Sequence, residues 1–300
     1  MNRKKFLIHT GLTMAGFVLL NNSIMAQLIQ DPAWKIKMLN DSMGVFTEKG
    51  GTILFFLSTD GIVVVDAQFP EQSQHLITEL KKKSTQPFHL LINTHHHSDH
   101  TAGNIIYKDL VSHVLAHQNS KINQERVAKE KKIEDQQLYP DQTYATTICQ
   151  TVDKEEICLH YFGPGHTNGD SFVHFKKANI VHVGDLVFNR RHPFIDRTAG
   201  ANIASWIKIL DKALATFSDK TIFVCGHALD GYDIVINKDD IKAFRNYLSK
   251  LLSFVKEEIK AGKTKEEILK TTIIAGAPEW KGDGIERPLT AAYEELTMVG

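Results

Sequence analysis

The chain lacks any excess of charge, since 35 lysines and arginines balance 35 aspartates and glutamates. Without a basic surplus the composition offers nothing that would attract nucleic acid, and we expect no such partner. No repeat or low-complexity segment interrupts the chain. The chain is long enough to bury a full core, and its length suits one large domain. We expect this domain to act on a small molecule. Its oligomeric state is left open.

A long apolar run is also missing, because the stretch from Gly11 to Leu20 is short for a membrane span of about 20 residues. Arg3-Lys4-Lys5 precedes this stretch and Ile24-Met25-Ala26 follows it, which is the layout of a secretory signal. We expect a signal peptide over residues 1–26 and a periplasmic or secreted product without stable membrane insertion. An uncleaved anchor is the alternative. Residues 2–7 resemble a twin-arginine signal in which lysine replaces one arginine.

Cysteine is scarce as well, and three cysteines in an exported chain leave at least one unpaired. If Asp153-Lys154 is a two-residue hairpin turn, Cys149 faces Cys158 at a non-hydrogen-bonded position, where strands approach closest. A disulfide is geometrically possible there, and two small buried hydrophobic residues are the alternative. Cys225 is read as a buried structural residue, although contact with a metal is possible.

Strand and helix patterns alternate along the rest of the chain. Expected strands cover residues 44–46, 52–57, 62–66, 88–93 and 221–224, with a β-rich stretch over 146–187; expected helices cover 71–83, 118–132, 206–217 and 241–259, and another starts after Thr264. Strands flanked by helices in two successive halves indicate two packed sheets with helices outside. We expect one domain over residues 27–237 and a helical extension over 238–300 that packs on the same domain.

The hexapeptide His95-His96-His97-Ser98-Asp99-His100 is the most informative feature, because it holds four possible metal ligands. It follows a predicted strand, so residues two apart point to the same side and His95 and His97 can bind one ion. Asp99 and His100 lie past the bend and can face a second ion. Eight further histidines are expected to be ordinary surface or packed residues, with His192 as an exception: His75, His89, His96, His113, His117, His160, His174 and His182.

At this hexapeptide the chain resembles the metallo-β-lactamase superfamily, whose signature His-x-His-x-Asp-His it matches at every specified position. The resemblance extends to three further elements at residues 163–167, 183–185 and 225–227, and spans about residues 40 to 230. It implies a four-layer αββα sandwich with the site along one edge. It also implies seven metal ligands, which are His95, His97, Asp99, His100, His166, Asp185 and His227.

The resemblance implies two Zn²⁺ per chain, one held by His95, His97 and His166 with a water as fourth ligand, which is the open arrangement of a catalytic site. Asp99, His100 and His227 would hold the second, and Asp185 would bridge the two. A hydroxide shared by the ions would attack the substrate, and Asp99 would orient it and receive its proton.

Four residues outside the ligand set are assigned as hypotheses. Asp66, at a strand end, is expected to hold a ligand histidine in its tautomer, or else only to end the strand. Asn189, Arg190 and His192 lie in the loop after Asp185 and are candidates for substrate binding; Arg191 is a further possible partner for a substrate carboxylate.

The substrate is predicted only as a small carboxylic-acid derivative: an ester, thioester, lactone or lactam. The ligand set resembles that of thioester and lactone hydrolases such as glyoxalase II, whereas familiar β-lactamases have cysteine or serine at the second metal. Export favours a true β-lactamase, which is the alternative. A second alternative, of another class, is a non-catalytic metal-binding protein or a di-iron redox protein on the same fold; a histidine-rich ligand set favours zinc.

Overall fold

The computed structural model describes residues 33–297. The chain divides into two units, residues 1–35 and residues 36–300, and the description below concerns the second. The predicted signal peptide lies outside the described residues. Among the helices from residue 33 to residue 297, none combines the length and the apolar character that crossing a bilayer requires.

The first sheet has seven strands in the order β1-β2-β3-β4-β5-β6-β7. They are β1 (Lys35–Met38), β2 (Met43–Thr47), β3 (Ile53–Leu57), β4 (Ile62–Val65), β5 (Phe88–Asn93), β6 (Val111–His117) and β7 (Gln142–Tyr144). From β2 to β4 the strands are antiparallel, and from β4 to β7 they are parallel. The parallel strands are joined by helices, so the loop after β5 lies at the sheet edge where their carboxyl ends meet.

The second sheet has six strands in the order β13-β12-β11-β10-β9-β8. They are β8 (Thr147–Val152), β9 (Glu155–His160), β10 (Phe172–Phe175), β11 (Ile180–Asn189), β12 (Ile222–Ala228) and β13 (Val235–Ile236). Only β11 and β12 pair in parallel. The β8–β9 hairpin turns at Asp153-Lys154 in the predicted register, and Cys149 faces Cys158. The two form a disulfide, with their Cα atoms 4.1 Å apart.

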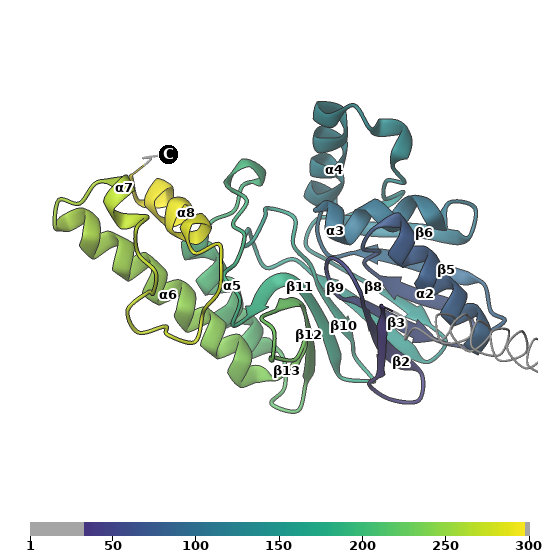
Figure 1. The fold of residues 1–300 in the computed structure, drawn as a ribbon. Helices are drawn as coiled ribbons and strands as arrows, with labels where there is room; N and C mark the ends of the chain where they lie inside the picture. The colour runs from purple at the N-terminus through teal and green to yellow at the C-terminus, as the bar shows by residue number, and fades with distance from the viewer. Residues whose placement is uncertain (1–32, 298–300) are drawn as a thin grey trace, which may run out of the picture. The chain divides into compact units, whose positions relative to one another are not determined.

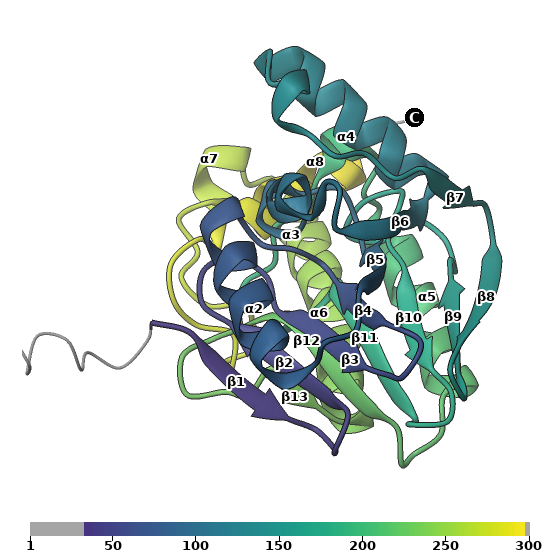
Figure 2. The same ribbon diagram turned by 90° about the vertical axis from the view of Figure 1, so that its right-hand side faces the viewer.

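The two sheets pack face to face over a shared apolar layer, to which both contribute alternate residues of their strands, among them Leu54, Val65 and Ile92 from the first sheet and Leu159 and Phe175 from the second. Figures 1 and 2 show helices on both outer sides. Beside the first sheet lie α2 (Pro70–Lys83), α3 (Ser98–Thr101) and α4 (Gln118–Lys131); beside the second lie α5 (Ile203–Thr216) and α6 (Lys238–Lys260). The predicted αββα sandwich is confirmed.

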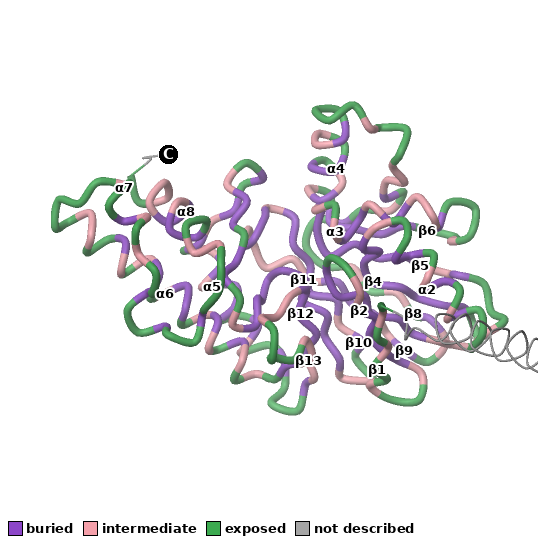
Figure 3. The backbone as a smooth tube through the Cα atoms, viewed as in Figure 1, coloured by how far each residue is buried: buried purple, intermediate pink, exposed green. Residues whose placement is uncertain are grey.

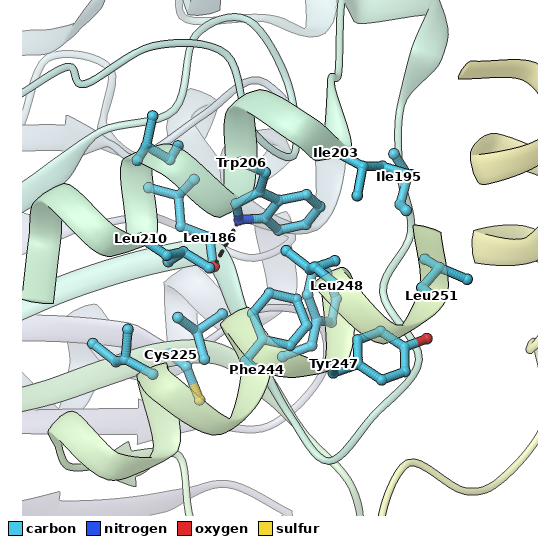
Figure 4. Close-up of a cluster of buried hydrophobic side chains, with 14 of the residues drawn as sticks. Leu186, Ile195, Ile203, Trp206, Leu210, Cys225, Phe244, Tyr247, Leu248 and Leu251 are labelled. Carbon is cyan, nitrogen blue, oxygen red and sulfur yellow. Dashed lines mark hydrogen bonds between the residues drawn. The ribbon is translucent and has the colours of Figure 1, made fainter. Parts of the chain in front are cut away.

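The second apolar cluster joins the outer face of the second sheet to the C-terminal helices. Figure 4 shows Trp206 of α5 over Phe244 and Leu248 of α6, with its indole nitrogen donating to Leu186 O at 3.0 Å. Helix α6 has a capping box at Asn237 and buries one face, while its other face is exposed, as Figure 3 shows. The buried face of α6 is thus part of this apolar cluster.

Two short helices follow, α7 (Lys265–Ile268), which has the predicted capping box, and α8 (Glu286–Thr297), which the sequence pattern did not predict. Helix α8 packs against α6, and its Leu289 and Ala292 are fully buried. Strands β1, β6, β7 and β13 were not predicted either.

Candidate metal centre

The ligand loop leaves the end of β5 in extended conformation and turns into α3 at Ser98. His97, the residue before the helix, is still extended, with φ −64° and ψ 146°. His95 and His97 point to the same side as predicted, since their ring nitrogens lie 3.1 Å apart. Asp99 and His100 lie in the first turn of α3 and face a neighbouring position. The bend therefore divides the hexapeptide between two groups of side chains.

The first group is formed by three histidines whose ring nitrogens converge. His97 Nδ1 lies 3.1 Å from His95 Nε2 and 2.9 Å from His166 Nε2. A tetrahedral zinc ion with Zn–N distances of about 2.0 to 2.1 Å would place its nitrogen ligands about 3.3 Å apart. The three nitrogens thus have nearly the spacing of ligands to one ion, although they come from two different sheets.

The second group is formed by Asp99, His100 and His227. His227 Nε2 lies 3.1 Å from Asp99 Oδ2, and His100 Nε2 lies 3.7 Å from the same oxygen. Phe188 stacks on the His227 ring at an interplanar angle of 15° and a centroid distance of 5.6 Å. This aromatic contact fixes the ring that closes the second group.

Asp185 lies between the two groups. Its Oδ2 is 3.6 Å from His166 Nε2 and 3.4 Å from His227 Nε2, while its Oδ1 is 3.1 Å from His100 Nε2. Asp185 lies in the middle of β11, where the pairing with β12 shifts register next to Gly184. That irregularity directs the carboxylate to the site from inside a strand.

Each of four histidines has its other ring nitrogen occupied. His100 Nδ1 donates to Asp66 Oδ2 at 2.7 Å, and His166 Nδ1 donates to the Phe194 carbonyl at 2.7 Å. His97 Nε2 donates to Asp196 at 3.0 Å. Thr94 gives its hydroxyl proton to Asp66, so its oxygen accepts from His95 Nδ1 at 3.0 Å.

These partners determine the tautomers. In the neutral form of each ring, the proton is used outside the site, so the nitrogen that faces the site carries a lone pair. Asp66 therefore does more than end a strand, because it is completely buried and accepts hydrogen bonds from both His100 and Thr94. His96, expected to be ordinary, shares the carboxylate of Asp196 at 3.5 Å.

The electrostatics differ between the two groups. Burial lowers the pKa of His166 to about 3, and burial together with His100 lowers the pKa of His95 well below its usual range, so both rings are neutral. At His227 burial acts in the opposite direction to the carboxylates of Asp185 and Asp99, which prevail and raise its pKa to about 9. Burial acts to raise the pKa of Asp99, but His100 and His227 outweigh it and hold this pKa at about 2.

The donor set fits metal ions. His100 Nε2 and Asp185 Oδ1 are fully buried and lie 3.1 Å from each other, but neither makes a well-aligned hydrogen bond among the described residues, although polar atoms in such positions are normally satisfied. Carboxylates gather where the histidine pKa values are raised, so this part of the site favours a positive charge. A metal ion would supply that charge and satisfy both atoms.

Two glycines show how closely the backbone surrounds these side chains. A Cβ at Gly226 would overlap Asp185 Oδ1, and a Cβ at Gly51 would overlap the His100 ring. Any larger residue at either position would displace a member of the site. The Gly-His element at residues 226–227 thus supplies both a donor and the space beside it.

A cavity of about 560 Å³ opens onto both groups, and His97, Asp99, Asp185 and His227 are part of its lining. This volume suits a small molecule. One wall comes from α4 and the segment after it. The other comes from the loop after β11 and from Arg287 of α8.

Two of the three predicted substrate contacts are not brought to this cavity. The Asn189 amide donates to the Asp233 carbonyl at 2.8 Å, and Arg190 pairs with Asp240 at 3.1 Å and with Glu279 at 3.4 Å. His192 does line the cavity. Cys225 does not face the site, since its buried Sγ contacts the carbonyl oxygens of His227 and Ile234.

Sequence reasoning missed Asp196 and Arg287. Asp196 lies in an irregular loop, and Arg287 lies in a helix that was not predicted. No local pattern connects either residue with the hexapeptide. Arg191 was considered only as one of several loop arginines, and the structure places it in the cavity wall.

An αββα sandwich with a histidine and aspartate cluster at its edge defines a class of metal-binding enzymes. The family model of the metallo-β-lactamase superfamily matches residues 47–227. The chain belongs to this superfamily, and it is a metal-dependent hydrolase.

Individual relatives are distant. The metallo-β-lactamase IND-1 of Chryseobacterium indologenes is 24% identical over 206 residues, which are 67% of this chain and 82% of that protein. The metallo-β-lactamase type 2 of Elizabethkingia meningoseptica is 22% identical over 207 residues, 66% of this chain and 80% of that protein.

Solved structures show the same fold. A metallo-β-lactamase from Pontibacter korlensis has a TM-score of 0.61 at 18% identity and covers 72% of this chain and 99% of its own. A double mutant of the sec-alkyl sulfatase PisA1 has a TM-score of 0.70 at 12% identity; the match covers 87% of this chain and 50% of that one.

Proposed function

We propose that this protein is an exported binuclear zinc hydrolase that cleaves a small carboxylic-acid derivative, namely an ester, thioester, lactone or lactam. The observation that supports it best is the set of fixed tautomers. Four histidines from both sheets direct lone pairs into the site, and their other nitrogens are bonded outside it. Such an arrangement is suited to ligating a cation.

In this proposal His95, His97 and His166 hold one ion, Asp99, His100 and His227 hold the other, and Asp185 bridges them. Three imidazole ligands favour zinc and leave its fourth position open. Two zinc ions bound there would lower the pKa of a water molecule towards neutrality and polarise the carbonyl oxygen of the substrate.

The protein's own groups then position the reactants. Asp99 is ionised and lines the cavity, so its carboxylate can orient the attacking water and accept its proton. Asp185 is buried and has a pKa well below the usual range, because His227 and His100 outweigh the effect of burial. It therefore remains an anion and serves to hold the site together.

Export is part of the proposal. The basic, apolar and small-residue layout of residues 1–26 supports it. The disulfide between Cys149 and Cys158 also supports it, because such bonds persist in oxidising compartments.

A β-lactam is one specific candidate substrate. The two relatives above are named metallo-β-lactamases, and they match most of their own length. In this chain, however, the second group contains no cysteine or serine of the kind that familiar β-lactamases have there. The Asp185 carboxylate lies between the two groups, and Cys225 points away from them.

The test is elemental analysis of the purified protein together with hydrolysis of a chromogenic cephalosporin, a lactone, a thioester and an ester, each with and without chelator. We expect two zinc ions per chain and chelator-sensitive turnover of at least one substrate. Two irons, or zinc without any hydrolysis, would contradict the proposal.

Asp185→Ala should reduce the metal content to one ion and lower turnover by about 100-fold or more, since the bridging ligand is lost. Asp211→Ala, which removes an exposed carboxylate of α5, is the control. Full metal content and full rate in Asp185→Ala would contradict the bridging role.

A further inference from the structure

The loop between β11 and α5 supplies hydrogen-bond acceptors to two histidines of the first group. The Phe194 carbonyl accepts from His166 Nδ1 at 2.7 Å, and the Asp196 carboxylate accepts from His97 Nε2 at 3.0 Å. The two acceptors are close neighbours in the chain. The orientation of both rings therefore depends on the position of this one loop.

A side chain from the C-terminal helix holds the far end of the loop. Glu295, in the last turn of α8, accepts from the Ile203 amide at 2.7 Å and from the Ala204 amide at 2.9 Å. These are the first two residues of α5, and such amides have no partner inside their own helix. Arg197 donates to the same carboxylate at 3.2 Å. Glu295 thus completes the N-terminus of α5, where the helix dipole also favours a negative charge.

The loop forms a closed turn that Arg197 joins to Glu295. The Asp196 carboxylate accepts from the Ala199 amide at 3.1 Å, and the Asp196 carbonyl accepts from the Ala201 amide at 3.0 Å. Arg197, the next residue, donates to the Ala201 carbonyl at 2.9 Å as well as to Glu295. Because these bonds connect both ends of the turn, a displacement of Arg197 would also displace Asp196.

The contact between α8 and the loop is shielded from solvent. The Glu295 side chain is 10% exposed. Ile195 and Ile203, on either side of the turn, are buried in the apolar cluster that α5 and α6 share (Figure 4). Water therefore competes weakly for the carboxylate, and hydrogen bonds to a charged group are strong in such surroundings.

We propose that Glu295 is a positioning residue for the first metal group. By holding the loop in place, its carboxylate keeps the two acceptors aligned with His97 and His166, although Glu295 lies outside the cavity lining. This inference rests on the proposed metal centre and adds a residue from the C-terminal helix to it. The second group should be affected much less, because His100 is held by Asp66 on the other sheet.

The test compares Glu295→Ala and Glu295→Gln with Glu294→Ala, the matched control. Glu294 is the adjacent residue of α8 and pairs with Lys265 at 2.9 Å instead. Competition between the protein and a chromophoric chelator for zinc gives the two affinities, and His166→Ala identifies the one that belongs to the first group. Glu295→Ala should weaken that affinity about 3- to 10-fold, less than the loss of a direct partner of a ligand.

Glu295→Gln keeps an oxygen acceptor, so it should weaken the first affinity by a smaller factor than Glu295→Ala does. Glu294→Ala should leave both affinities unchanged. Val255→Ala, which removes buried apolar groups from α6, is the control for a general loss of stability and should also leave both unchanged. An unchanged first affinity in Glu295→Ala, or an equal loss in Val255→Ala, would overturn the inference.

A double-mutant cycle tests whether Glu295 acts through the loop. Glu295→Ala should weaken zinc binding by a smaller factor in the Asp196→Ala background than in the wild type, because one of the two acceptors is already missing there. Equal factors in both backgrounds would overturn the proposed connection between Glu295 and the first group.

The metal-free protein provides a readout that does not depend on zinc. His166 is fully buried and donates its Nδ1 proton to the Phe194 carbonyl, so this proton is protected from exchange. In chelator-treated protein, NMR should show this proton exchanging with water about threefold faster or more in Glu295→Ala, and at the wild-type rate in Glu294→Ala. If the wild type binds no zinc, the proposed function fails, and this measurement still decides the inference. Equal exchange rates in wild type and Glu295→Ala would overturn it.

Discussion

At the scale of single residues, the site depends on groups outside the seven predicted ligands. Asp196 accepts from His97 and, more distantly, from His96; it also accepts from the Thr198 hydroxyl and the Ala199 amide. The Asp196 carboxylate therefore fixes the orientation of the His97 ring. It also holds its own loop in place through Thr198 and Ala199. Such partners commonly contribute 10- to 100-fold to metal affinity.

We therefore predict that Asp196→Ala weakens metal binding about 10- to 100-fold, and that Asp196→Asn, which keeps an oxygen acceptor without the charge, has an intermediate effect. Competition with a chromophoric chelator measures the affinity. Asp211→Ala again serves as the control. Wild-type affinity in Asp196→Ala would show that His97 is held in its orientation by other contacts.

Asp170 gives a prediction about pH. It is buried and accepts from the amide and hydroxyl of Thr167, and burial raises its pKa to about 7. In the folded state it stays protonated between pH 4 and about 7, where the unfolded chain is ionised. Because the folded state binds more protons, this group's contribution to stability is present at low pH and lost as pH rises to 7.

Asp170→Asn resembles the protonated form and does not titrate. We predict that it gains about 1 to 4 kcal/mol of unfolding free energy relative to wild type at pH 8, and little at pH 4. Urea denaturation at the two pH values measures the difference. A loss of stability that is equal at both pH values would mean that the Asp170 carboxylate is ionised in the folded protein.

At the scale of elements, the β8–β9 hairpin was predicted to the residue. Alternation on either side of Asp153-Lys154 determines which residues face each other, so the pairing of Cys149 with Cys158 is confirmed. Helix α8 shows the opposite case. The first turn of α8 contains Pro288 and follows a glycine-rich segment. Its apolar residues are buried because α8 packs on α6. Periodicity within one segment cannot indicate a partner that is distant in sequence.

The disulfide can be separated from catalysis. Strand β8 is the outermost strand of its sheet, and the bond closes a short loop that the hairpin already holds together. We predict that reduction lowers stability by about 2 kcal/mol or less and leaves kcat/KM unchanged. Thermal unfolding with and without reductant measures this, and Cys149→Ser should be insensitive to reductant. A loss of activity upon reduction would indicate that β8 influences the cavity.

At the scale of the whole molecule, the site joins the two sheets. The hexapeptide follows β5 of the first sheet, while Asp185 and His227 lie in β11 and β12 of the second. The sequence predicted these seven residues because they are grouped in short elements that follow or belong to strands. It could not predict Asp196 or Arg287 as part of the site, since their positions depend on how loops and helices of both halves pack together.

Metal removal should therefore destabilise the entire sandwich as well as abolish activity. In this proposal the ions bind carboxylates and imidazoles from both sheets. Once the ions are removed, these groups can be neutralised only by protons or by pairing with one another. A ligand present at about 100 times its dissociation constant stabilises the folded state by about 2.7 kcal/mol, which for a chain of this size corresponds to roughly 4 to 5 °C in Tm. We predict a fall of this size upon chelation, reversed by added zinc and smaller in Asp185→Ala. If chelation removes all metal by elemental analysis and Tm does not change, the ions do not connect the two sheets, and the seven side chains are held in place by the protein alone.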